Sequence, residues 1–244
     1  MNLIVLEPED FVAADRVRLT DRRCVHARKH LKLALGDRLK VGLLDEGEGP
    51  PAPNLGEGEV LRCDREALEL RVRLGKLPPP ALAITLALAL PRPHTLDKVL
   101  QQATALGVKR LLLFHARRVE KSYWDASAIE PAAIRHQLCL GLEQSVDTVL
   151  PSVELHRRFR PFVEQRLASM RERGPVLVAD PDGPVACPRA VPGPLTLVLG
   201  PEGGFVEFER ERFAALGDQL VHLGPRILRV ETATVALLAR LAPS

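Results

Sequence analysis

A glycine-rich turn follows a strongly apolar stretch near the C-terminus. The segment Leu197-Val198-Leu199-Gly200-Pro201-Glu202-Gly203-Gly204-Phe205 predicts a buried strand that enters a turn and then an acid-rich helix. Glycines let backbone amides approach a ligand closely and permit positive φ. The turn matches neither the dinucleotide fingerprint nor the phosphate loop, and the acids that follow would repel phosphate at a helix start. The turn therefore favours a neutral or cationic ligand, with a plain capped turn as the alternative.

A second turn carries a charged pair between apolar residues. Gly224-Pro225 is followed by Ile227-Leu228, then by Arg229 and Glu231, and finally by small residues that begin a helix. Arg229 would need a carboxylate or a ligand as its partner if it were buried, and Glu231 is the nearest candidate. For Glu231 the alternative is simple capping, because an acid in the first turn suits the helix dipole.

The elements around these turns indicate how they are positioned. After Pro78-Pro79-Pro80, strands are expected at 81–90, 110–114, 176–179 and 195–199, and helices at 95–106, 131–142, 161–171, 206–216 and 232–241. Continuous apolar strands that alternate with helices predict an α/β fold with a parallel sheet covered on both faces. In such sheets the ligand binds beyond the carboxyl ends of the strands. The loops after Ala179 and Leu199 are therefore the expected place for chemistry.

The residues before the triple proline show a different pattern. Short β-type runs are expected at 3–6, 38–43, 58–63 and 67–74, and these favour a small β-barrel. A short helix is expected at 26–35, capped by Gly36, with Arg28, Lys29 and Lys32 on its exposed side. Because a proline run is stiff and extended, it predicts a domain boundary after residue 77. The two domains would then comprise residues 1–77 and 78–244.

Composition excludes several classes of protein. The chain is 46% hydrophobic and 27% charged, and its longest apolar run, 81–90, is about half the ~20 residues of a membrane-spanning helix. Four widely spaced cysteines predict neither a metal site nor a disulfide framework, which favours a reducing, cytoplasmic setting. The net charge of +3 means that RNA binding would depend on local basic clusters, found at 16–32, 117–121 and 157–160. Ordinary solvated surface is the alternative for each cluster.

Taken together, these motifs resemble the RsmE-like family of ribosomal RNA methyltransferases. GPEGGF at 200–205 and LGPRILRVETA at 223–233 occur in that order, and ALGV at 105–108, RRV at 117–119 and EQS at 143–145 agree upstream. The resemblance implies a SPOUT-type domain, in which a parallel sheet carries a trefoil knot, preceded by a PUA-like β-barrel that binds RNA. It also implies a homodimer that uses S-adenosylmethionine to methylate N3 of a uridine in small-subunit (16S) ribosomal RNA. No metal is expected, because the methyl donor is already activated. The expected substrate is the RNA in an assembled subunit, with free RNA as the alternative.

The resemblance also implies roles for individual residues. The cofactor pocket would comprise Asp180, Leu199, Gly200, Pro201, Glu202, Gly203, Leu223, Gly224, Ile227, Leu228 and Arg229. The basic clusters, together with Arg92, supply the candidate RNA-binding residues, which are Arg22, Arg23, Arg28, Lys29, Lys32, Arg92, Arg117, Arg118 and Lys121. Arg229 is the candidate to stabilise the developing oxyanion, and Glu231 could act as a base if it lay within about 3 Å of N3.

Several positions depart from the family pattern. Thr95, Gln102, Ala105, Asp147 and Val149 stand where relatives usually carry other, charged residues. Either nearby basic residues take over the phosphate contacts, which tolerate rearrangement, or the chain acts on another RNA. Two other classes also stay open: a non-enzymatic RNA-binding or ribosome-assembly factor, and a metabolic enzyme that binds a small nucleotide at the glycine-rich turn.

Overall fold

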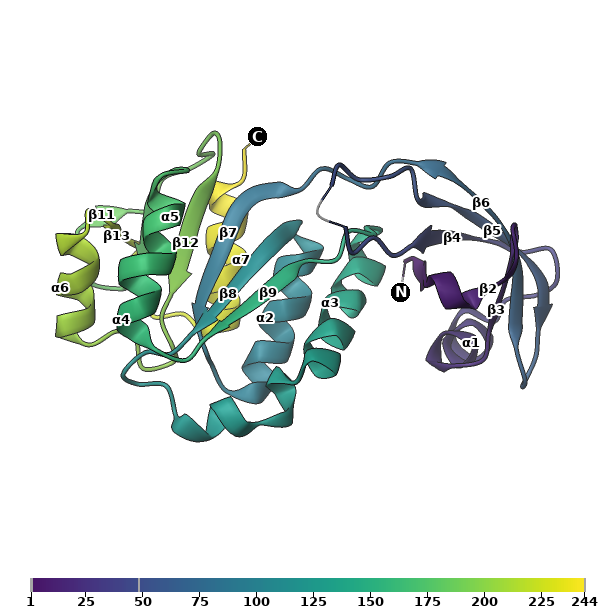
Figure 1. Ribbon diagram of the computed structural model, residues 1–244, viewed down its shortest axis with the longest axis horizontal. Coiled ribbons are helices and arrows are strands. Elements are labelled where there is room, and N and C mark those ends of the chain that lie inside the picture. The colour runs from purple at the N-terminus through teal and green to yellow at the C-terminus, as the bar shows by residue number, and fades with distance from the viewer. Residues whose placement is uncertain (1, 48, 244) are drawn as a thin grey trace. The chain divides into compact units, whose positions relative to one another are not determined.

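The computed structural model describes residues 2–47 and 49–243 (Figure 1). The chain forms two compact units. The first contains the residues up to Pro80 together with Leu142–Leu150, and the second contains Ala81–Gly141 and the residues from Pro151 onward. Within the first unit, Thr148 Oγ1 donates a hydrogen bond to Asn54 Oδ1 (2.7 Å). A short piece from later in the chain thus completes the N-terminal unit, which local sequence patterns did not indicate.

The first unit is built on a six-stranded sheet in the order β1-β4-β5-β6-β3-β2. Its strands are β1 Ile4–Leu6, β2 Phe11–Ala13, β3 Arg16–Leu19, β4 Arg38–Leu43, β5 Leu55–Cys63 and β6 Leu68–Lys76. The four predicted strands are confirmed, whereas β2 and β3 were missed. β3 buries Val17 and Leu19 and exposes Arg16 and Arg18, so its period-two pattern was hidden inside a segment interpreted as a basic cluster.

The helix predicted at 26–35 has different bounds. Helix α1, Arg22–His26, begins after Asp21, whose carboxylate accepts a hydrogen bond from the Arg23 backbone N–H. It continues as a π-helical turn, Ala27–Leu31, and ends at Lys32, which has a left-handed φ of 52°. The expected cap at Gly36 is therefore wrong, because the chain has already left the helix four residues earlier.

The second unit contains a seven-stranded parallel sheet in the order β11-β13-β10-β12-β7-β8-β9. Its strands are β7 Leu82–Ala89, β8 Val108–Phe114, β9 Ser152–His156, β10 Val176–Ala179, β11 Val185–Ala186, β12 Leu195–Leu199 and β13 Gln219–His222. All five residues of β12 are buried, as expected for a central parallel strand. The predicted α/β fold with a parallel sheet is confirmed, and the strands β9, β11 and β13 are additions.

Helices cover both faces of this sheet (Figure 1). They are α2 Pro93–Ala105, α3 Pro131–Ser145, α4 Phe159–Pro161, α5 Leu167–Arg171, α6 Glu207–Ala215 and α7 Val230–Leu241. The strand order reverses direction between β9 and β10, so right-handed crossovers place α2 and α3 on one face and α5 and α6 on the other. Helix α7 packs against α2. No helix in the described part of the chain is long and apolar enough to cross a membrane.

Candidate active site

A pocket lies at the carboxyl ends of β10, β12 and β13. Ala179 pairs with Leu199 on one side and with Val221 on the other, so the loops after these three residues begin side by side. The three loops and the start of α7 enclose a cavity of about 120 Å³. The sheet topology therefore produces the site at the edge where parallel α/β sheets bind ligands.

An aromatic anchor fixes the glycine-rich turn after β12. Phe205 is buried, and its ring centroid lies 5.1 Å from that of Phe213 and 6.3 Å from that of Phe114. Gly204 has a φ of +69°, a conformation that residues with a side chain rarely adopt. The Gly204 backbone N–H donates to the Pro201 carbonyl oxygen (2.8 Å), which closes the turn.

Most of the predicted cofactor residues meet at this cavity. The lining includes Asp180, Leu199, Gly200, Pro201, Glu202, Leu223, Gly224, Ile227 and Leu228. Residues that the sequence did not single out also line it: Ala179, Pro181, Gly204, Val221, His222, Arg226, Val230, Ala233 and Leu237. Most of these additional residues are apolar or come from β13 and α7. Their spacing in the sequence does not indicate that they lie together in one pocket.

Gly203 has a different position from the one predicted. It lies outside the lining, and a Cβ atom added to it would meet Arg118 Cδ at 3.0 Å. The Gly203 carbonyl oxygen accepts a hydrogen bond from Arg118 Nη1. The absence of a side chain at Gly203 therefore leaves room for a basic side chain, and of these two adjacent glycines only Gly204 borders the pocket.

Asp180 lines the pocket with a compensated charge. It is buried, and its Oδ2 lies 3.3 Å from Arg210 Nε in α6. Its Oδ1 accepts a hydrogen bond from the backbone N–H of Asp182 (2.9 Å). Asp180 thus ties the loop after β10 to α6, and the ion pair with Arg210 was not predicted.

The expected pairing of Arg229 with Glu231 is wrong. Arg229 is exposed and outside the lining, whereas Glu231 Oε1 lies 3.4 Å from Lys98 Nζ in α2. A hydrogen bond from its own backbone N–H, then Lys98 and the charge of Arg229, lower the pKa of Glu231 below its ordinary value of 4.5. Glu231 is therefore ionised at neutral pH and a weak base. The packing of α7 on α2 brings Lys98 to this carboxylate.

Three predicted RNA-binding arginines surround the glycine-rich turn. The Arg92 backbone N–H donates to Glu202 Oε1 (3.1 Å), and the Arg117 backbone N–H donates to Glu209 Oε1 (2.7 Å). Arg118 reaches the turn through Gly203, as described above. The side chains of Arg92, Arg117 and Arg118 are exposed, as is Lys121 at the start of a helical turn, Lys121–Asp125.

The predicted RNA-binding residues of the first unit divide into two groups. Lys29 and Lys32 are exposed and Arg28 is half-buried. Arg22 instead forms a two-point contact with the buried carboxylate of Glu143 (2.8 and 3.1 Å). Arg23 is only 8% exposed and is bound by two carboxylates and a backbone oxygen, those of Asp10, Asp21 and Val5. Arg23 is therefore a structural residue, and the prediction that it contacts RNA is wrong because its guanidinium is already satisfied inside the unit.

Asp147, a departure from the family pattern, has a structural role. It is buried, and its Oδ1 accepts hydrogen bonds from the backbone N–H groups of Thr148 (2.7 Å) and Val149 (3.1 Å). Val146, just before it, has a positive φ of 59°. A carboxylate at this position stabilises the turn that follows α3. The positions Thr95, Gln102 and Ala105 all lie on α2.

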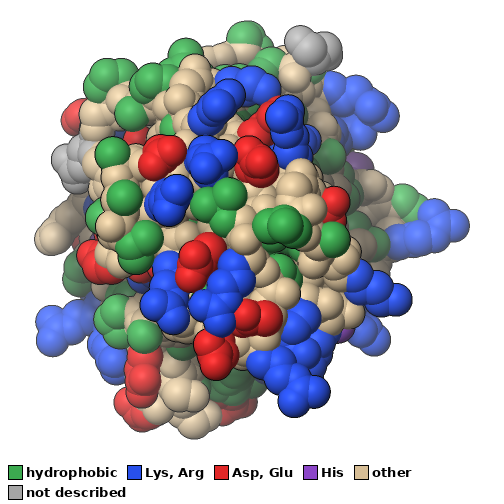
Figure 2. Space-filling model, turned by 90° about the vertical axis from the view of Figure 1, so that its right-hand side faces the viewer, with side chains coloured by type: hydrophobic (Ala, Val, Ile, Leu, Met, Phe, Trp, Pro, Cys, Tyr) green, Lys and Arg blue, Asp and Glu red, His purple; other side chains and the backbone are tan. Residues whose placement is uncertain are grey.

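The surface charge is mixed. Figure 2 shows Lys and Arg side chains interspersed with Asp and Glu across the face that it presents, in line with a net charge of only +3. Among the described residues, no group of three His, Cys, Asp or Glu side chains could hold a metal ion.

Comparison with known proteins places the chain in a family. The model of the RNA methyltransferase domain matches residues 78–242. The chain therefore belongs to the RNA methyltransferase family, and the resemblance to its RsmE-like members is confirmed. The ribosomal RNA small subunit methyltransferase E of Treponema pallidum is 28% identical over 98% of this chain and 90% of that protein. The Mycobacterium bovis protein of the same name is 30% identical over 75% of this chain and 74% of its own length.

A solved structure shows the same fold. The crystal structure of a ribosomal RNA small subunit methyltransferase E from Neisseria gonorrhoeae, bound to S-adenosyl methionine, has a TM-score of 0.72 and 24% identity. The match covers 98% of this chain and 95% of that one. The fold of this chain is thus shared with that structure.

Proposed function

We propose that the protein transfers a methyl group from S-adenosylmethionine to N3 of a uridine in 16S ribosomal RNA. The observation that carries this proposal is the pocket at the ends of β10, β12 and β13 with three exposed arginines beside it. The relatives named ribosomal RNA small subunit methyltransferase E support the choice of RNA. The arginines suit a polyanion, whereas the pocket itself lacks a phosphate-binding motif.

The chemistry of the pocket fits this cofactor. Leu199, Val221 and Leu237 supply apolar walls, and the backbone of the glycine-rich turn supplies polar groups without a side chain in the way. The cavity of about 120 Å³ is smaller than the roughly 300–1,000 Å³ typical of ligand pockets. The cofactor would therefore also occupy the open space that adjoins the cavity, beside the loop at 224–229, where Gly224 has a φ of +113° and Ile227 is 86% exposed.

Residues of this chain would orient the reaction. When bound, S-adenosylmethionine supplies an activated methyl group. Arg229 lies between Leu228 and Val230, which line the pocket, and its exposed guanidinium would stabilise charge that develops on a uracil oxygen. Glu231, ionised and paired with Lys98, would hold the start of α7 in position and is poorly suited to remove a proton.

The architecture that we propose follows the family. The second unit, with the domain boundary at 78, would be a SPOUT domain whose C-terminal segment forms a trefoil knot. Backbone hydrogen bonds from Ala190 to Arg240 (2.9 Å) and from Val191 to Leu241 (3.0 Å) hold the end of α7 beside the loop before β12, which supports this topology. Residues 1–77, the main part of the first unit, would form a PUA-like barrel that binds RNA through Lys29, Lys32 and Arg28.

We also propose that the protein is a homodimer and that its substrate is RNA in an assembled small subunit. Ile227, Leu228 and Val185 are apolar and exposed beside the pocket or on β11, a short edge strand. Their burial in a homodimer would remove apolar surface from water. The RNA would be bound in an assembled small subunit, where its shape is fixed and phosphate contacts can select it.

A methyl-transfer assay tests the proposed function. Purified protein and labelled S-adenosylmethionine would be incubated with small ribosomal subunits from cells that lack the gene, and the RNA would be digested for nucleoside mass spectrometry. We expect N3-methyluridine at one position. Transfer to another nucleoside would redirect the proposal to a different RNA, and cofactor binding with no transfer to any RNA would contradict it in favour of a non-enzymatic RNA-binding factor.

A further inference from the structure

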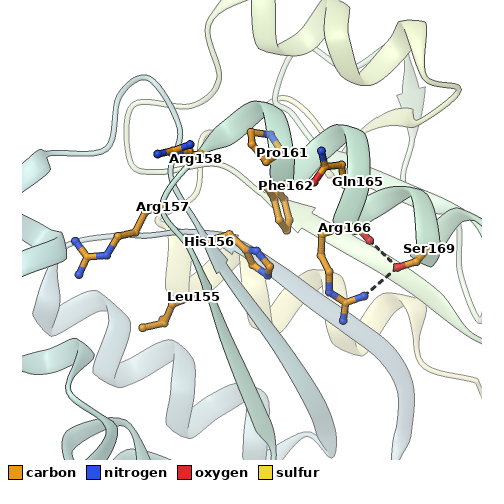
Figure 3. A pocket seen from close by; sticks show the side chains of 9 residues that line it. All are labelled: Leu155, His156, Arg157, Arg158, Pro161, Phe162, Gln165, Arg166 and Ser169. Atoms are coloured by element: carbon orange, nitrogen blue, oxygen red, sulfur yellow. Dashed lines mark hydrogen bonds between the residues drawn. The ribbon is translucent and has the colours of Figure 1, made fainter.

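A basic pocket lies at the carboxyl end of β9, apart from the cofactor cavity. It has a volume of about 650 Å³ and is formed by the end of β9, the loop that follows and the helical segment after it. Its lining consists of Leu155, His156, Arg157, Arg158, Pro161, Phe162, Gln165, Arg166 and Ser169 (Figure 3). The volume is in the range of sites that hold a small molecule or one nucleotide.

One arginine of this pocket carries a charge with no carboxylate beside it. Arg158 is exposed, and within residues 2–47 and 49–243 it forms no ion pair. Figure 3 shows His156 and Phe162 between Arg158 on one side and Arg166 on the other. An anion that entered between them would meet the unpaired charge of Arg158, whereas Glu154 already contacts Arg166 and lies 3.2 Å from His156 Nε2.

The other two arginines are held in place. Arg166 forms a two-point contact with Glu154 (2.7 and 2.6 Å) and donates to Ser169 Oγ (2.9 Å). Arg157 donates to the Trp124 carbonyl oxygen (3.0 Å), and its guanidinium carbon lies 5.2 Å from the centre of the indole ring. The nearest acid to Arg157, Asp125, is 4.0 Å away and 84% exposed, so it neutralises little of the charge. Arg157 and Arg166 are therefore held in place, and the net positive charge of the pocket comes from Arg157 and Arg158.

The walls of the pocket also suit a nucleotide. Leu155, Pro161 and the buried Phe162 provide apolar surface, and the exposed amide of Gln165 provides a donor and an acceptor. An apolar wall accepts a base or a ribose, and guanidinium groups accept a phosphate. A metabolite with an acidic group would use the arginines, but it would leave most of this wide opening empty.

The position of the pocket connects it to the cofactor site within the same unit. Both lie at the carboxyl edge of one parallel sheet, and β12 and β9 are separated by three strand spacings. This distance is about 14 Å, or roughly four stacked nucleotides. Arg117 and Arg118 follow β8, between the two sites, and the His115 backbone N–H donates to the His156 carbonyl oxygen (2.9 Å). The basic residues thus line one continuous edge.

We propose that this pocket binds one nucleotide of the substrate RNA strand, a few positions from the nucleotide that is methylated. Arg158 and Arg157 bind its phosphate, and the surface formed by Leu155, Pro161 and Phe162 holds its ribose or base. The RNA runs from the glycine-rich turn, past Arg118, to this pocket. The inference rests on the proposed function in that it takes RNA as the substrate.

The test compares two double variants of the full chain. Arg157→Gln with Arg158→Gln removes the charge of the pocket. Arg173→Gln with Arg189→Gln is the matched control, because both of these arginines are exposed and lie outside the pocket. Binding to naked 16S ribosomal RNA and to a uridine 20-mer would be measured between about 50 and 200 mM salt, the range in which phosphate contacts are most evident.

We expect the pocket variant to bind both RNAs on the order of tenfold more weakly, with the slope of log K against log salt reduced by roughly 1.4 to 1.8. The control should change affinity less than twofold, and the affinity of both variants for S-adenosylmethionine should stay unchanged. Equal RNA affinities and slopes for the two double variants would overturn the proposal. The proposal would also be overturned if binding of inorganic phosphate required Arg157 and Arg158 but binding of RNA did not. The pocket would then bind a free anion.

The outcome is separable from that of the proposed function. RNA binding that depends on these arginines in a protein that transfers no methyl group would contradict the proposed function and support the pocket. Methyl transfer with a KM for RNA that is the same in both double variants would support the proposed function and contradict the RNA-binding role of the pocket. In the expected case, the pocket variant raises KM and leaves kcat unchanged, because the site does not touch the reacting atoms.

Discussion

Arg118 Nη1 donates a hydrogen bond to the backbone carbonyl oxygen of Gly203, 85 residues further along the chain. This contact joins the basic segment after β8 to the glycine-rich turn after β12. A guanidinium that is otherwise exposed to solvent is thereby held beside the proposed cofactor pocket. The proposed RNA contact and the proposed cofactor pocket therefore share one turn, and the two glycines of that turn should have separable effects.

Gly203→Ala and Gly204→Ala should differ in what they impair. A Cβ on Gly203 meets the flexible Arg118 side chain at 3.0 Å, so we expect weaker RNA binding and a cofactor affinity within twofold of wild type. Alanine at Gly204, where φ is +69°, costs about 1–2 kcal/mol, so cofactor affinity should fall on the order of tenfold. Calorimetric titration with S-adenosylmethionine measures the cofactor affinity of both variants. If Gly203→Ala were the more damaging of the two for the cofactor, the assignment of Gly204 to the pocket would be wrong.

Phe205→Ala should destabilise the second unit and loosen the turn. The ring is buried against Phe114 and Phe213, so its removal should cost about 3–5 kcal/mol in the free energy of unfolding. Phe208→Ala is the matched control, since Phe208 is 51% exposed and its removal should cost no more than about 0.5 kcal/mol. Urea unfolding followed by circular dichroism distinguishes the two. Similar midpoints for both variants would show that Phe205 does not anchor the turn.

Arg23→Gln should affect folding and not RNA binding. The guanidinium is buried between Asp10 and Asp21, so its loss leaves uncompensated carboxylates and should cost about 3–5 kcal/mol. In folded protein at low temperature, the salt dependence of RNA affinity should match that of wild type. A stable Arg23→Gln protein with a flatter salt slope would mean that Arg23 contacts RNA after all.

The triple variant Arg28→Ala, Lys29→Ala, Lys32→Ala should weaken RNA binding without affecting folding. Arg28 and Lys29 lie on the π-helical turn that continues α1, Lys32 ends it, and the two lysines are exposed. We expect the melting temperature to change little, while the slope of log K against log salt falls by roughly two for RNA. Cofactor affinity serves as the internal control and should not change. An unaltered slope would exclude the first unit's helix as an RNA-binding surface.

Glu231→Gln tests the role of the ion pair with Lys98. The folded-state pKa of Glu231 lies below 4.5, so the carboxylate contributes stability above about pH 4.5 that is lost as the pH falls through its lowered value. The Glu231→Gln variant should therefore be less stable than wild type at pH 7, and the gap should close below pH 4.5. Thermal melts across this range measure it, and a double-mutant cycle with Lys98→Met should give a coupling of roughly 0.2–1 kcal/mol.

The same variant separates positioning from proton removal. Because Glu231 is ionised throughout the neutral range, its replacement should lower kcat without moving any rise in the pH profile between pH 6 and 8. Loss of such a rise in Glu231→Gln alone would identify the residue as the base.

Much of the second unit could be predicted from local patterns. Runs of buried Leu and Val such as 195–199, bounded by glycine and proline, specify parallel strands because both faces of such a strand are covered. The glycine-rich turn and the Leu223–Gly224 turn are likewise visible in the chain. The position of the ligand pocket beyond the carboxyl ends of the strands could be predicted from the general geometry of α/β sheets.

Tertiary structure decided which charged groups meet. Arg23 and Lys29 are six residues apart in one basic cluster, yet one is buried between two carboxylates and the other is exposed. Glu231 pairs with Lys98 and not with Arg229 because α7 packs on α2, 133 residues away in sequence. Gly203 and Gly204 are neighbours with different tasks, which depend on the approach of Arg118. Sequence patterns determine the elements because burial and backbone conformation are local preferences, whereas the partner of a charge depends on which distant segments fold against it.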